Sequence, residues 1–80
     1  MSENPISIYA DFNNADAAGR LRLNATGSLR DLERLPESPV DGQAVTVVSE
    51  DLRVEGIMRF SVEEDIWVAE IDWNAIVEIL

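Results

Sequence analysis

One stretch of the chain decides the fold: VTVVSEDLRVEGIMRFSVEEDIWVAEIDW, residues 45–73. Apolar side chains alternate with polar ones along most of it, and this period of two is typical of half-buried β-strands. The alternating apolar residues are Val45, Val47, Leu52, Val54, Met58, Phe60 and Val62. The stretch therefore predicts two consecutive β-hairpins that share one apolar face.

The first hairpin is expected to turn at Glu50-Asp51 or in a longer or bulged loop of the same parity, and the two-residue turn places Val47 opposite Val54 and Val45 opposite Gly56. The second is expected to turn in a four-residue loop, 63–66, which also sets Arg59 opposite Glu70 as a pair of opposite charges. The pairs expected on its apolar face are Val62–Trp67, Phe60–Ala69, Met58–Ile71 and Gly56–Trp73.

The same alternation predicts two strands nearer the start of the chain, at 6–12 and 21–25. A hairpin across the loop 13–20 brings their apolar residues together and sets Asp11 opposite Arg22. The pairs expected on its apolar face are Phe12–Leu21, Ala10–Leu23 and Ile8–Ala25.

A short helix is expected at 29–34, with Ser28 as its N-cap and Asp31 as a capping-box partner. Pro36 ends it, and its leucines are expected to close one end of a barrel or to form a docking surface. Residues 74–80 leave two alternatives open. One is a single turn at Trp73–Ala75 followed by a strand that closes the sheet against Ile6–Phe12, and the other is a C-terminal helical turn.

Five short strands with a single turn before the last resemble the SH3-like small barrels. The pattern Gly42-x-x-Val45-x-Val47, followed by Trp67-x-Ala69, is similar to the SH3 sequence rhythm. The resemblance implies an all-β, mainly antiparallel domain over 1–80, a five- to six-stranded barrel or sandwich with one short helix. The aromatic-rich groove of SH3 domains is not evident in the sequence, so binding of proline-rich peptides is not implied.

Composition excludes several kinds of chemistry. The chain has no cysteine and no histidine, and all six of its basic residues are arginines. Disulfides, thiolate zinc sites and a Ser-His-Asp triad are therefore impossible within it. The net charge of −10 repels phosphate backbones and anionic lipid. The acidic N-terminus and the absence of an apolar run of about 20 residues predict a soluble, cytoplasmic protein without a membrane partner.

The function that these features favour is a non-catalytic protein-interaction domain without a cofactor, able to form a homodimer or to bind a basic partner. Its contact patch is expected on the outer face of the central sheet, unless the helix or the C-terminal tail covers those residues. The expected patch comprises Ala44, Val48, Ile57 and Val68.

Two alternatives are weaker. A single-stranded nucleic acid could bind Tyr9, Arg20 and Arg22 by stacking and charge, but the same residues are more simply cross-strand pairs on a wet face. A carboxylate-based metal site or hydrolase is the other, since the loop 11–16 carries oxygen ligands that resemble part of a calcium loop. That loop lacks the closing glutamate of an EF-hand, so a plain loop is the simpler interpretation.

Overall fold

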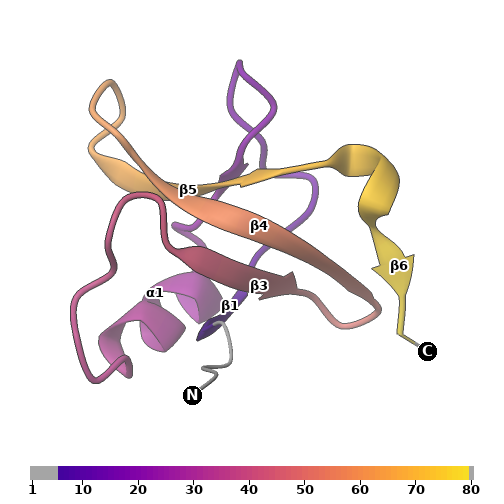
Figure 1. The fold of residues 1–80 in the computed structure, drawn as a ribbon, viewed down its shortest axis with the longest axis horizontal. Coiled ribbons are helices and arrows are strands. Elements are labelled where there is room, and N and C mark those ends of the chain that lie inside the picture. The colour runs from indigo at the N-terminus through magenta and orange to yellow at the C-terminus, as the bar shows by residue number, and fades with distance from the viewer. Residues whose placement is uncertain (1–5, 80) are drawn as a thin grey trace.

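The computed structural model describes residues 6–79, which form a mixed six-stranded sheet with one short α-helix packed beside β1 (Figure 1). The strand order is β1-β3-β4-β5-β2, and β6 pairs with β4 off this path. The elements in chain order are β1 (Ile6–Tyr9), β2 (Leu21–Arg22), α1 (Thr26–Glu33), β3 (Ala44–Val48), β4 (Leu52–Ser61), β5 (Ile66–Ile71), the 3₁₀ turn η1 (Trp73–Ala75) and β6 (Val77–Glu78).

The chain is mostly β, as the sequence predicts, but the expected barrel is not confirmed because the sheet is not closed. Of the two alternatives for the last segment, the first has the correct elements: a 3₁₀ turn at Trp73–Ala75 is followed by a short strand. The strand pairs with the start of β4 at Leu52 and Arg53, not with β1. No helix among the described residues is long and apolar enough to cross a membrane.

The β3–β4 hairpin has the expected register, with Val47 opposite Val54 and Val45 opposite Gly56. Its turn lies at Glu50-Asp51 and is closed by a 2.9 Å hydrogen bond from the Ser49 N–H to the Leu52 carbonyl. The alternation of side chains was sufficient to predict this register, because a slip by one residue would have moved every buried valine to the exposed face.

The β4–β5 hairpin differs from the expected register by two residues. Its four-residue loop is 62–65, with Asp65 in the left-handed region at φ 59°, and the Asp65 N–H closes it on the Ser61 carbonyl at 2.7 Å. Phe60 consequently lies opposite Trp67, and the two rings meet edge to face with centroids 5.2 Å apart. A shift by two leaves each side chain on its face, so alternation alone could not select between the registers.

The remaining pairs of this hairpin are shifted by the same two residues relative to the expected ones. Glu70 lies opposite Ile57 rather than Arg59, although the Arg59 guanidinium still donates to Glu70 Oε1 across 3.3 Å. Gly56 allows β4 to approach β5 closely, because a Cβ there would lie 2.9 Å from both the Glu70 carbonyl oxygen and Ile71 Cγ2.

The expected hairpin between the first two strands is wrong. β1 pairs in parallel with β3, and β2 pairs antiparallel with β5, so the two strands occupy opposite ends of the strand order. The reason is a tighter turn around Asp16, whose Oδ1 accepts hydrogen bonds from the Ala18 and Arg20 N–H groups. This turn folds Ala15 against Leu21, which leaves Phe12 no place beside Leu21.

Helix α1 begins at Thr26, earlier than the expected 29, and Ser28 is not its N-cap. Ser28 is fully buried instead and donates its hydroxyl to the Tyr9 carbonyl, while the Asp31 carboxylate accepts the Tyr9 N–H at 2.8 Å. Gly27 lets the helix approach the tyrosine ring, because a Cβ at this position would lie 2.8 Å from Tyr9 Cδ2. Three residues of one helix therefore hold Tyr9.

The core lies on one face of the sheet, where α1 covers its β1 end. Leu32 and Leu35 pack against it, whereas Leu29, where the helix was expected to begin, is 49% exposed. The buried core residues are Ile8, Ala10, Leu21, Leu23, Val45, Val47, Val54, Met58 and Ala69.

The contact between Gly27 and Tyr9 gives a stability prediction. Gly27→Ala should lower the free energy of unfolding by about 1–3 kcal/mol, because the added methyl group overpacks against the ring. This outcome is opposite to the gain of roughly 0.5–1 kcal/mol that Gly→Ala usually gives within a helix. Urea denaturation measures it, with the exposed Thr26→Ala as the control on the same helix. An unchanged or higher stability of Gly27→Ala would contradict the tight contact between Gly27 and the Tyr9 ring.

Candidate interaction surface

The structure places the members of the expected apolar patch in different environments. Ala44 lies directly opposite Ile57 on β3 and β4, so these two are adjacent. Val68 lies in the next row, between Arg59 and Arg22, and is 0% exposed. Val68 therefore contributes no surface to a contact.

Val48, the fourth member, lies at the far end of β3. The pair Thr46–Glu55 separates it from Ala44, and the Thr46 hydroxyl donates to Glu55 Oε1 at 3.2 Å. A polar row thus interrupts the outer face. The four residues do not form one continuous patch, and a contact at Ala44 and Ile57 stays a prediction.

The residues expected to contact nucleic acid are not brought together. Tyr9 is in β1 and Arg22 is in β2, at opposite ends of the strand order. Both arginines are also occupied by acids. Arg20 Nε donates to Asp16 Oδ2 and Arg22 Nε donates to Glu64 Oε1, each at 2.8 Å.

The Arg22–Glu64 pair is bidentate, since the second guanidinium nitrogen donates to Oε2 at 2.9 Å. The hydrogen bonds from Arg22 hold the pKa of Glu64 below its ordinary value and raise that of the arginine. A third nitrogen donates to the Ala15 carbonyl at 2.9 Å and to Asn14 Oδ1 at 3.2 Å. Arg22 therefore ties the Asp16 turn to the β4–β5 loop and has little capacity left for a phosphate.

Asp16 is the acceptor that holds its own turn closed. Burial alone would raise its pKa, but hydrogen bonds from the Arg20 N–H and guanidinium and from the Ala18 N–H outweigh burial and lower it. Asp11, at the other end of the calcium-like loop, accepts the Asn13 N–H at 2.9 Å. Both carboxylates thus serve the loop itself. Residues 6–79 contain no group of three or more acidic side chains arranged to hold a metal ion.

Tyr9 lies against negative charge rather than beside a base-stacking groove. The carboxylate of Glu50 raises the pKa of the Tyr9 hydroxyl, with smaller contributions from burial and from Asp11. Its ring faces Gly27 of α1. A nucleic acid would have to approach this ring past two carboxylates, which is unfavourable.

The structure shows an exposed apolar segment that the sequence analysis missed. Trp73, Val77 and Ile79 are 43%, 45% and 46% exposed, and they lie on η1, on β6 and just after it. The Trp73 indole is held in place because its Nε1–H donates to the Gly19 carbonyl at 2.8 Å. In Figure 1, β6 lies at one side of the molecule, next to the turn that joins β3 and β4. The sequence left a strand and a helical turn as alternatives here, because the pattern of 74–80 covers too few residues to choose between them.

β6 has an open edge, whereas the outward edges of the two end strands of the sheet are each covered in part. Side chains of α1 satisfy the outward N–H and carbonyl of Tyr9 in β1. The chain around Ala15 covers β2, where the Arg22 N–H donates to the Asn14 carbonyl at 2.9 Å. Within residues 6–79, β6 pairs with β4 alone, and its other edge carries no such cover.

No protein-family model, curated protein or solved structure matches the chain. The interpretation of β6 therefore rests on its own geometry. The Ile79 N–H donates to the Asp51 carbonyl at 3.0 Å, so Ile79 directs its backbone toward β4. Backbone groups alternate in direction along an antiparallel strand, and the N–H and carbonyl of Glu78 consequently point to the open edge.

The surroundings of β6 are acidic. Asp51 and Glu78 lie at the pairing with β4, and Asp72 caps η1 by accepting the Asn74 N–H at 2.9 Å. Arg53, opposite Val77, is the basic residue at this pairing. An open edge, exposed apolar side chains and a surplus of negative charge thus occur together.

The Asp16 turn gives a prediction about acid stability. The pKa of Asp16 is lowered from 3.8 in the folded chain, so its stabilising effect is complete above that value and is lost as the pH falls through the lower folded-state pKa. Asp16→Asn should therefore lower Tm at pH 7, and the difference from the parent should shrink toward pH 2. Thermal melts monitored by circular dichroism across this range measure the effect. Glu63→Gln, in the exposed loop, should keep the parent profile, and a pH-independent difference for Asp16→Asn would contradict the assignment.

Proposed function

We propose that this protein is a small, non-catalytic protein-interaction domain that binds an extended, basic segment of a partner along β6. The observation that carries the proposal is the open edge of β6, flanked by the exposed Val77 and Ile79. Addition of a strand to such an edge is a common mode of peptide recognition, in which the backbone gives affinity and the side chains give selectivity.

Apolar contact alone is too weak to hold a partner here. Complete burial of a large apolar side chain is worth about 1.5–3 kcal/mol. The exposed halves of Trp73, Val77 and Ile79 therefore offer about 3 kcal/mol together. Association costs at least about 4 kcal/mol in lost motion. Backbone hydrogen bonds to Glu78 and attraction between opposite charges have to supply the remainder.

Charge favours a basic partner over a second copy of the chain. A net charge of −10 repels an identical molecule and attracts a basic one. Asp51, Asp72 and Glu78 add to this attraction at β6 itself. Attraction of this kind mainly raises the rate of encounter and weakens with added salt.

The outward N–H of Glu78 allows a specific test. Proline is tolerated on edge strands where the N–H faces solvent, so Glu78→Pro should fold and yet lack one donor for the partner strand. Glu78→Thr removes the same charge and keeps the donor. We expect Glu78→Pro to bind an alternating Arg-Val octapeptide roughly fivefold or more weakly than Glu78→Thr, as loss of one hydrogen bond predicts.

Titrations of the ¹⁵N-labelled chain followed by NMR measure these affinities, and an alternating Glu-Val octapeptide controls for charge. Shifts confined to β6 and the start of β4 support the proposal. Equal affinity of the two variants, or equal binding of the acidic peptide, would contradict it. Sedimentation equilibrium distinguishes a homodimer from binding to a different partner. If the parent has twice the monomer mass of 8.9 kDa and Glu78→Pro has the monomer mass, the partner at β6 is a second copy of the chain.

A further inference from the structure

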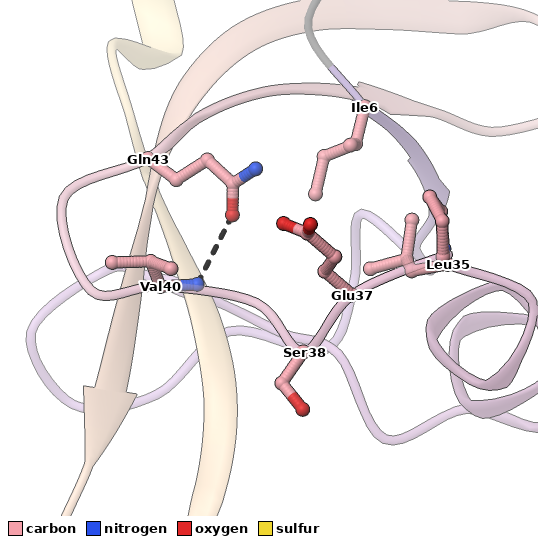
Figure 2. A pocket seen from close by; sticks show the side chains of 7 residues that line it. Ile6, Leu35, Glu37, Ser38, Val40 and Gln43 are labelled. Atoms are coloured by element: carbon pink, nitrogen blue, oxygen red, sulfur yellow. Dashed lines mark hydrogen bonds between the residues drawn. The ribbon is translucent and has the colours of Figure 1, made fainter.

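A separate pocket lies at the end of the sheet where β1 and β3 begin. Its volume is about 210 Å³, and three apolar side chains, Ile6, Leu35 and Val40, form much of its wall. Figure 2 shows the Glu37 carboxylate pointing into the space between Ile6 and Gln43. Apolar walls and one carboxylate thus face the same space.

The polar groups of the pocket leave one charged acceptor for a ligand. Gln43 Oε1 already accepts the Val40 N–H at 3.0 Å, which fixes the amide at the rim. Glu37 takes part in none of the ion pairs formed among residues 6–79. The nearest basic residue in sequence, Arg34, follows the end of α1 and also makes none of them.

We propose that this pocket receives one basic side chain, arginine or lysine, of a partner protein. Its alkyl stem would lie along Ile6, Leu35 and Val40, and its cationic head would meet the Glu37 carboxylate. Long basic side chains bury their stems against apolar surface in this way. An anion would be repelled by Glu37 and by the net charge of the domain. An apolar side chain would strip water from the carboxylate without replacing it, which is costly.

The size of the pocket agrees with a single side chain. Pockets for drug-sized ligands and cofactors occupy roughly 300–1,000 Å³. At about 210 Å³ this one is smaller. The site is also distinct from β6. Gln43 accepts the Met58 N–H, whereas β6 pairs with Leu52, and these two positions are roughly 20 Å apart along an extended strand at about 3.3 Å per residue. The inference therefore goes beyond the proposed function and does not depend on it.

NMR titration of the full ¹⁵N-labelled chain with defined probes tests the site. The probes are N-acetyl-arginine amide and N-acetyl-lysine amide, with N-acetyl-norleucine amide as an uncharged analogue of the lysine chain. We expect both basic probes to shift the amide signals of Ile6 and Gln43. Glu37→Gln should lower the affinity for both probes about fivefold or more. Glu63→Gln removes the same charge in the exposed β4–β5 loop and should leave the affinity within twofold.

Several outcomes would overturn the proposal. Equal losses in the Glu37→Gln and Glu63→Gln variants would show that only the overall negative field attracts the probes. If N-acetyl-norleucine amide bound as tightly as N-acetyl-lysine amide, the Glu37 carboxylate would have no role in binding. Signal shifts at residues away from the pocket would show that the probes bind elsewhere. Melting temperatures of both variants verify folding. Because the readout lies at Ile6 and Gln43, its result is independent of any binding at β6.

Discussion

The hydrogen bonds that α1 makes to the backbone of Tyr9 are the contact on which the rest of the sheet depends. A parallel pair such as β1–β3 needs a long connection, and here that connection carries the helix. Ser28 and Asp31 lie one turn apart and satisfy the carbonyl and N–H that β1 directs away from the sheet. Each bond adds only about 1 kcal/mol, but an unsatisfied buried group would cost about 1–3 kcal/mol. Gly27 is a consequence of the same contact, because the helix reaches these groups only by approaching the tyrosine ring.

Once β1 is held under the helix, it cannot also pair with β2 or receive the last strand. β2 lies instead at the far end beside β5, and β6 returns to the start of β4. The sheet therefore stays open, and its edges differ: side chains of α1 cover β1 at Tyr9, and a turn covers β2. Natural sheets usually protect edges by such devices. β6 is short and carries Glu78, which limits indiscriminate pairing, yet the apolar side chains beside it are half exposed. The edge of β6 is therefore only partly protected, which agrees with the proposed addition of a partner strand.

Alternation of side chains predicted what depends on neighbours in sequence and failed where distant segments decide. It gave the register of β3 and β4, since Val47 and Val54 must share a buried face. It could not fix β4–β5, where a shift by two residues is silent and the Phe60–Trp67 contact selects the pairing. The same limit applies to the sites. Ala44 and Ile57 lie in one row of the sheet. Burial of Val68 depends on strands at both its sides, and the β6 edge and the Glu37 pocket arise from contacts that no local pattern encodes.

The arginines explain why both proposed sites present negative charge. Arg20, Arg22 and Arg59 are held in ion pairs with acids from three loops, which precede β2, follow β4 and precede β3, respectively. Their positive charge stabilises turns and is not displayed as a patch, so the surplus of acids faces solvent. A net charge of −10 on 80 residues also repels itself, which opposes compaction of a domain this small. The proposed basic partner would relieve that repulsion as it binds, and any ligand that prefers the folded chain stabilises it. Under the two proposals, recognition and stability of this domain are coupled through one surplus of charge, with the backbone edge of β6 and the carboxylate of Glu37 as the two places that would hold a partner.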